Sequence, residues 1–467
     1  MQSTIVFADD IGSQLSHWIF STVFLQFLVT FLFAFLFPIT SAAIINYLER
    51  KVMAWMQDRK GPLHVGPHGS LQLLADIGKL LTKEDVHPAQ TDKMVFLLAP
   101  SAFIAPMIAS FAVLPFSPFI GLPGTALATG IVYLVAMSSL DVIGVIMAGW
   151  GSNNKYALMG GLRAAAQMIS YELPLVLALV GVVMLTSVLA GSAGNPGSVS
   201  IGTLSIKEIM TFQNSWRDTG IGILDFIFKG FTPWAWFILV QPLMLLIYYT
   251  CGLAETNRSP FDLPEAESEL VAGFLTEYSG GRWAMFFLGE YGNMTIVSAI
   301  TTSLFLGGWS GPGVGFLTAP GMAFGWQLLG NLLGLIYFVS KVYLLCVIFI
   351  WIRGTLPRLR ADQLMQFAWL ILIPATLGNI LLTGLIYLAV SGLGLSNLVF
   401  LIVTGAINWL LLIGFIRLVG RATVATTRRA QAPSLRARAR QAALVPVAER
   451  AEPSGDGGRA IIKSGQG

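Results

Sequence analysis

Residues that bind redox metals are scarce in this chain of 467 residues, which has two cysteines and four histidines. Cys251 and Cys346 stand in separate apolar runs without CxxC spacing, so we expect two small buried side chains. The histidines all lie outside the apolar runs: His17, His64, His68 and His87. A transmembrane haem or an iron–sulfur cluster therefore has no ligand set in this chain. Electrons for any redox role must come from a partner protein.

Charge is also scarce, since 11% of the residues are charged and 55% are hydrophobic, with a mean hydropathy of +0.72. This composition excludes a water-soluble domain and indicates a chain whose solvent is lipid. Runs long enough to cross a bilayer as helices lie near residues 18–48, 94–115, 127–149, 172–190, 234–253, 284–308, 327–352, 367–390 and 396–416. The sequence predicts an all-α polytopic membrane protein with about nine transmembrane helices.

The basic residues are unevenly distributed between the loops. With the N-terminus outside, 24 of the 28 Lys and Arg residues fall on the inside. Because inside loops of membrane proteins are enriched in Lys and Arg, this bias predicts an outside N-terminus and an inside C-terminus. The first apolar run is too long for a signal peptide and lacks a basic leader, so we expect a retained helix. Residues 1–420 are expected to form one membrane domain, and residues 421–467 a disordered basic tail on the cytoplasmic side.

The first inside loop, residues 49–93, contains a helical pattern. Leu73, Ile77, Leu80 and Leu81 recur at helical spacing, with polar residues on the other side. The pattern predicts a short amphipathic helix at the membrane surface. An interfacial anchor without chemistry explains it equally well.

A later inside loop, residues 254–283, is unusually acidic. Its acidic side chains are Glu255, Asp262, Glu265, Glu267, Glu269 and Glu277. Asp262 and Glu265 flank a proline in an arrangement that starts a helix, with Asp262 as the cap. A solvated acidic loop is the simple explanation, but interleaved apolar residues such as Leu263 and Phe274 are not needed in such a loop.

Ionisable residues within or at the edges of the apolar runs are few. They are Glu49, Asp141, Glu172, Glu290 and Lys341. Each is costly in hydrocarbon and persists mainly where it faces a cavity or a partner. Carboxylates that are partly buried and mutually close can exchange protons near neutral pH, as a proton relay requires.

Five segments carry recognisable signatures: "ERKVMAWMQDRKGP" continued by "LQLLADIGKLLTKE", "AGWGSNNKYALMGGLRAAAQMISYE", "AETNRSPFDLPEAESELVAGFLTEYSG", "FFLGEYGNM" and "WIRGTLPRLRADQLM". In order and spacing, from about residue 40 to residue 375, they resemble the H subunit (subunit 1) of respiratory complex I, the proton-pumping NADH:quinone oxidoreductase. The resemblance implies a membrane protein that docks a hydrophilic arm through its inside loops and forms much of a quinone chamber.

The resemblance also implies roles for individual residues. Those expected to line or shape the quinone cavity are Glu49, Arg50, Arg59, Asp76, Lys341 and Arg353. Lys341 is expected to lie with the basic groups at the inner wall of the cavity. Those expected to form the acidic proton pathway are Glu172, Glu255, Asp262, Glu265, Glu267, Glu269 and Glu290. Asp141 is not part of the family pattern and is left unassigned.

The same resemblance implies that this chain binds no cofactor of its own. Quinone would be the substrate, and FMN and iron–sulfur clusters would reside in partner subunits. The expected partners are hydrophilic quinone-site subunits, adjacent small membrane subunits and lipid, with no nucleic acid. The expected location is a bacterial inner membrane.

Two other functions remain open. A stand-alone transporter or channel would use membrane-embedded acids and a lysine equally well, although we find no inverted repeat of the kind many transporters have. The membrane subunit of an energy-converting hydrogenase would share the fold without using quinone, but the near-complete complex I motifs argue against it.

Overall fold

The structure is a computed structural model that describes residues 22–86, 88–118, 125, 127–190, 203–214, 236–263, 272–318, 324–394 and 399–420. Within these ranges the chain is helical and contains no strand. The prediction of an all-α polytopic membrane protein is therefore confirmed. By its internal contacts the chain divides into one unit that ends at Trp409 and a second that begins at Leu410.

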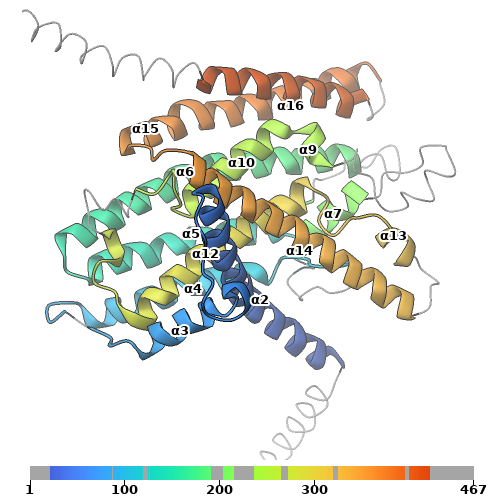
Figure 1. Ribbon diagram of the computed structural model, residues 1–467. Helices are drawn as coiled ribbons and strands as arrows, with labels where there is room; N and C mark the ends of the chain where they lie inside the picture. Colours follow the sequence, from blue (N-terminus) through green and yellow to red (C-terminus); the bar gives the residue numbers. More distant parts are fainter. Residues whose placement is uncertain are drawn as a thin grey trace, which may run out of the picture. The chain divides into compact units, whose positions relative to one another are not determined.

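The longer helices of the first unit appear in Figure 1 in their order along the chain. They are α2 (Thr22–Met56), α4 (Lys93–Phe111), α5 (Gly130–Gly151), α6 (Lys155–Ala190), α10 (Pro242–Glu255), α12 (Gly280–Phe305), α14 (Phe324–Thr355) and α16 (Ile373–Gly392). The shorter ones are η1 (Pro67–Gly69), α3 (Gln72–Thr82), α7 (Ile206–Asn214), α9 (Phe237–Val240), η4 (Gly273–Leu275), α13 (Val314–Leu317) and α15 (Ala361–Gln366). A π-helical segment, Phe367–Leu372, joins α15 to α16. The last described helix, Val399–Gly420, follows them.

Among the described residues, six helices are long and apolar enough to cross a membrane. They are Lys93–Phe111, Gly130–Gly151, Lys155–Ser187, Gly325–Thr355, Ala361–Gly392 and Val399–Gly420. The three other predicted spans overlap α2, α10 and α12, of which α10 is a shorter apolar helix. The count of nine spans and the orientation stay predictions.

Two helix boundaries differ from the sequence prediction. The fourth run is predicted to begin near residue 172, whereas α6 begins at Lys155. The first half of α6 contains polar residues, so it does not form a continuous apolar run. It is helical because one side packs against other helices, and there Ala164, Ala165 and Met168 are buried. The fifth run is interrupted at Gln241, whose backbone dihedral angles are not helical. Helix α10 begins at the next residue, Pro242. Hydropathy alone does not report either feature.

Helix α12 lies among other helices and packs against α2, α4, α10 and α14. Nearly every residue from Phe286 onward is buried, including Thr295, Ser298 and Thr301. Each of these hydroxyls donates a hydrogen bond to the carbonyl four residues earlier, so none of the three is left without an acceptor. A helix that protein surrounds in this way can carry polar groups at membrane depth.

The amphipathic helix predicted within residues 49–93 is present as α3. No residue of α3 is fully buried, and Leu74 and Leu81 are exposed. Both cysteines are buried and free, as expected. The proposed helix start at Asp262 lies partly outside the described residues, as does the tail after residue 420.

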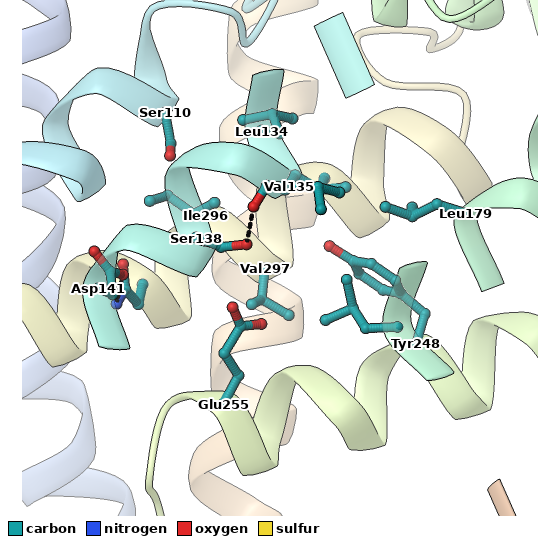
Figure 2. Close-up of a pocket in the computed structure, with 13 residues that line it drawn as sticks. Ser110, Leu134, Val135, Ser138, Asp141, Leu179, Tyr248, Glu255, Ile296 and Val297 are labelled. Atoms are coloured by element: carbon teal, nitrogen blue, oxygen red, sulfur yellow. Dashed lines mark hydrogen bonds between the residues drawn. The ribbon is translucent and has the colours of Figure 1, made fainter. Parts of the chain in front are cut away.

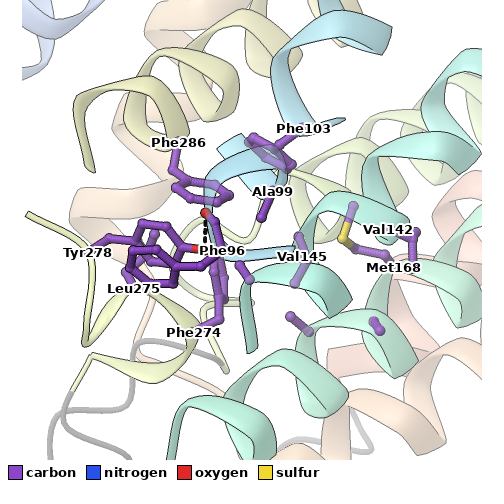
Figure 3. Close-up of a cluster of buried hydrophobic side chains, with 13 residues drawn as sticks. Phe96, Ala99, Phe103, Val142, Val145, Met168, Phe274, Leu275, Tyr278 and Phe286 are labelled. Carbon is purple, nitrogen blue, oxygen red and sulfur yellow. Dashed lines mark hydrogen bonds between the residues drawn. The ribbon is translucent and has the colours of Figure 1, made fainter. Parts of the chain in front are cut away.

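An aromatic core fixes the segment before α12 to the helices around it (Figure 3). The rings of Phe96 and Tyr278 stack with centroids 4.2 Å apart, and the Tyr278 hydroxyl donates to the carbonyl of Phe96 at 3.2 Å. Phe286 contacts Tyr278 edge-on at 4.9 Å. Burial raises the pKa of Tyr278, so its phenol remains a neutral donor at physiological pH. This core holds the end of the acidic loop in place.

Candidate functional site

Glu49 lies near the C-terminal end of α2 and joins three helices. One of its oxygens, Oε1, forms an ion pair with Arg353 near the end of α14. The other, Oε2, accepts a hydrogen bond of 2.7 Å from the Tyr291 hydroxyl on α12. The Glu49 side chain is 12% exposed and that of Arg353 is 34% exposed. The pair is therefore partly open to solvent, within reach of a molecule that approaches from the loops at this end of α2 and α14.

A second ion pair ties the amphipathic helix to α2. Arg50 contacts Asp76 with an N–O distance of 2.6 Å, and Gln72 donates to the other Asp76 oxygen at 3.2 Å. Arg50 follows Glu49 in sequence, so both ion pairs start from the same turn of α2. The structure thus brings together four of the residues predicted to shape a quinone cavity.

Deeper in the bundle, Arg258 and Glu290 form a buried ion pair at 3.1 Å, with side chains 10% and 7% exposed. Arg258 was not singled out from the sequence. Removing two such charges from water is costly, so a pair of this kind is maintained only by close partners.

Two further carboxylates face an internal cavity of about 30 Å³ (Figure 2). Its polar lining consists of Ser110, Ser138, Asp141, Tyr248, Glu255 and Asn293, and its other lining residues are apolar. Glu255 lies at the end of α10 and lines the cavity together with Ser138 on α5, whose hydroxyl donates to the carbonyl of Val135 at 3.0 Å. Because a water molecule needs about 10–15 Å³ in such a space, the cavity has room for water between these polar groups.

Asp141 lines this cavity, although its sequence pattern gave it no role. It is 3% exposed on α5, and its Oδ2 accepts a hydrogen bond of 2.7 Å from Asn293 on α12. One feature of the sequence pointed to Asp141: it follows Ser138 by three residues, which places both side chains on one face of the helix. The sequence could not show that Glu255 and Asn293 would face the same cavity.

Two of the other predicted acids have polar partners, one near this cavity and one in the loop that follows α10. Glu172 on α6 accepts a hydrogen bond from Ser139, the neighbour of Ser138. Asp262 lies 3.5 Å from Arg358, in the loop after α14. Glu265, Glu267 and Glu269 lie outside the described residues.

Lys341 and Arg59 lie apart from the ion pairs described above. The Lys341 ammonium donates to the carbonyls of Leu306, Gly308 and Ser310 at 2.8, 3.0 and 2.8 Å. These carbonyls follow the end of α12, whereas Arg353 is twelve residues further along α14, about 18 Å away. Arg59, just beyond α2, donates to Gln57 at 2.7 Å.

Comparison with known proteins gives consistent matches over most of the chain. A family model described as NADH dehydrogenase matches residues 28–384. The NADH-quinone oxidoreductase H 1 subunit of Geobacter sulfurreducens is 41% identical over 373 residues, which cover 76% of this chain and 93% of that protein. The H subunit of Dehalococcoides mccartyi strain CBDB1 is 42% identical, covering 78% of this chain and 88% of the relative. The H subunit of Brevibacillus brevis is 44% identical, covering 73% and 87%.

Proposed function

Because this chain belongs to the NADH dehydrogenase family, among the H subunits of NADH-quinone oxidoreductase, we propose that it helps form a quinone chamber. In this proposal it couples quinone reduction to proton translocation through buried carboxylates. The activity belongs to the assembled oxidoreductase, in which this chain is a multi-pass membrane subunit. The membrane would be a bacterial inner membrane.

The observation that carries the proposal is the series of charged groups from the inner loops to the interior of the bundle. It starts at Arg50–Asp76 and Glu49–Arg353, whose side chains are partly exposed. It continues at Arg258–Glu290 and ends at the cavity that Glu255 and Asp141 line. In a protein this apolar, buried acids of this kind mark a functional pathway by default.

The chemistry of quinone reduction fits this arrangement. A quinone that accepts two electrons takes up two protons to become a quinol, so negative charge and then protons must be accommodated beside it. Arg353 supplies a positive charge for the reduced oxygen, and Glu49, ionised beside Arg353, is a carboxylate that can accept a proton and pass it on. A change of charge here alters the field at the buried acids, where low dielectric makes such interactions strong.

The proposal requires partners that carry the redox groups. The partly exposed Arg50, Asp76 and Arg353 side chains would be covered by a hydrophilic partner that brings an iron–sulfur cluster to the quinone. FMN and the NADH site would lie in further subunits, and small membrane subunits would take up the proton pathway. Glu265, Glu267 and Glu269 remain predicted relay residues, while Arg59 and Lys341 remain predicted cavity residues.

Substitution of Glu49 tests the quinone role. In the assembled complex, Glu49→Gln keeps the size of the side chain but removes the charge that pairs with Arg353. We expect quinone reductase activity to fall by about tenfold or more, since hydrogen bonds to charged groups contribute about 1.5–3 kcal/mol. Activity is measured in membranes with an added short-chain quinone, and proton pumping is recorded separately.

Asp58→Asn is the matched control, because it makes the same chemical change at an exposed position just after α2. It should leave activity at the wild-type level. Full quinone reductase activity and normal pumping in Glu49→Gln would remove Glu49 from the proposal. Purification of this chain alone as a transport-competent protein would favour a stand-alone transporter instead.

A further inference from the structure

Tyr291 occupies the space between the two ion pairs of the candidate site. It is 3% exposed and lies on α12 directly after Glu290. Its hydroxyl donates to Glu49 Oε2 at 2.7 Å, which is the oxygen that Arg353 does not hold. The Tyr291 phenol therefore joins Glu49 and Arg353 as a third interacting group.

The other side of Tyr291 faces the buried pair. The guanidinium carbon of Arg258 lies 4.3 Å from the centre of the Tyr291 ring and 5.3 Å from that of Phe287. Phe287 precedes Tyr291 by one helical turn, and their rings meet edge-on at 4.7 Å. The same Arg258 contacts Glu290 at 3.1 Å. Arg258 is thus held by an aromatic face and by a carboxylate.

From these contacts we infer that Tyr291 is a positioning residue that transmits the charge state of Glu49 to the Arg258–Glu290 pair. The inference rests on the proposed function, because it assumes that the charge at Glu49 changes during quinone reduction. In this inference, the side chain of Tyr291 links the partly exposed Glu49–Arg353 pair to the buried Arg258–Glu290 pair.

The physical basis is polarisation of the phenol. A hydroxyl that donates to an ionised carboxylate makes a stronger hydrogen bond than one that donates to a neutral acid. The same interaction pushes electron density into the ring, and the negative ring face attracts a guanidinium. When Glu49 loses its negative charge, both interactions weaken together. Arg258 is then held less by the ring and more by Glu290, while the phenol keeps its proton throughout.

Tyr291→Phe isolates the hydroxyl, because it keeps the aromatic ring under Arg258. In the assembled complex we expect the kcat of quinone reduction to fall about tenfold, as for loss of a hydrogen bond to a charged group. The KM for quinone should change less than the kcat, since Tyr291 is not exposed to a substrate. Proton pumping should fall at least as far as quinone reduction.

Tyr249→Phe is the matched control. Tyr249 is also a buried tyrosine in a packed helix, and its hydroxyl donates at 2.7 Å to a backbone carbonyl, that of Leu345, instead of to a charged group. The substitution therefore removes an equally short buried hydrogen bond without touching the ion pairs. It should leave the kcat and KM at wild-type values once the amount of assembled complex is equal.

A double substitution shows whether Tyr291 acts through Glu49. If it does, Glu49→Gln combined with Tyr291→Phe has the activity of Glu49→Gln alone, because residues in one network are not additive. A wild-type kcat in Tyr291→Phe, or a double variant with the product of both losses, would overturn the inference. If Glu49→Gln alone has full activity, the proposed quinone role fails first, so the two failures are distinguishable.

Arg258→Lys tests the same inference from the side of the buried ion pair. It keeps a positive charge near Glu290 but loses the planar group that stacks on the Tyr291 ring. We expect the same pattern as for Tyr291→Phe, a lowered kcat with a smaller change in KM. Normal kcat and pumping in Arg258→Lys contradict the inference even if Tyr291→Phe fails to assemble.

Discussion

At the scale of single residues, polar groups with little exposure to solvent are held by specific partners, both within the candidate site and away from it. Glu49 has a separate partner for each carboxylate oxygen, and Asp141 is held by an amide. Lys341 is the most complete case, because its ammonium donates to three carbonyls and lies 4.3 Å from the centre of the Trp236 ring. Burial of such groups is tolerated only when their hydrogen bonds are made inside the protein.

Lys341→Met tests the structural contribution of the ammonium. The substitution leaves three carbonyls beyond α12 without their shared donor, and an unsatisfied buried group costs roughly 1–3 kcal/mol. We expect the complex that carries Lys341→Met to inactivate at a lower temperature than the wild-type complex. Thermal inactivation of purified complex provides the measurement.

Lys155→Met, at an exposed position at the start of α6, is the control and should not change the inactivation temperature. Loss of quinone reductase activity in Lys341→Met without loss of stability would contradict a structural role. It would favour the sequence-based assignment of Lys341 to the quinone cavity.

At the scale of elements, close helix contacts set the geometry of the site. The acidic loop reaches α6 where Gly160 faces Gly273, so closely that a Cβ on Gly160 would lie 2.6 Å from the Gly273 Cα. Glycine at this point lets the two backbones touch. Gly252 of α10 likewise faces Val297 of α12, near the cavity that Glu255 lines. These glycines therefore bring the helix backbones close enough for short polar side chains on one helix to contact groups on the next.

Gly160→Ala should separate α6 from the segment that precedes α12. Because the obstructing atoms are backbone, they cannot turn aside, and overpacking of this kind costs roughly 1–3 kcal/mol. We expect less assembled complex in membranes and faster proteolysis of the 254–283 loop. Both are measured by immunoblot after limited digestion.

Gly378→Ala is the comparison, since a Cβ there meets nothing within 4 Å in the helix α16. It replaces a helical glycine by a better helix former and should be neutral or slightly stabilising. Equal assembly and equal proteolysis of the two variants would contradict the importance of the Gly160 contact.

At the scale of the whole molecule, the distribution of charge predicts how the chain lies in the membrane. Most Lys and Arg residues belong to loops assigned to the inside, and the ion pairs of the candidate site involve these same loops. An orientation with the N-terminus outside would put the Glu49–Arg353 pair on the side where the proposed hydrophilic partner would dock.

Cysteine labelling tests this orientation. The native Cys251 and Cys346 are buried and should react little with a membrane-impermeant maleimide. Lys83→Cys lies in the first inside loop and Lys207→Cys in α7, and both positions are exposed. In sealed vesicles whose inner side faces the medium, we expect labelling of Lys83→Cys alone. In vesicles of the opposite orientation the result should reverse, and the same pattern in both preparations would contradict the predicted topology.

The sequence by itself determined the class of protein, because hydropathy depends on composition along the chain and not on packing. It also identified α3 and most individual acids, because amphipathic spacing and isolated charges in apolar runs are local signals. It missed the early start of α6 and the break at Gln241, since both depend on neighbours that replace lipid with protein.

Only the tertiary structure decided which charges meet. Glu49, Tyr291 and Arg353 are far apart in sequence, yet one carboxylate joins them. Asp141 gained a candidate role only when α5, α10 and α12 proved to enclose one cavity. Lys341 and Arg353 share α14, but the helix length places them in different surroundings. The sequence specifies which groups are costly to bury, and the packing of helices specifies which partner makes each burial possible.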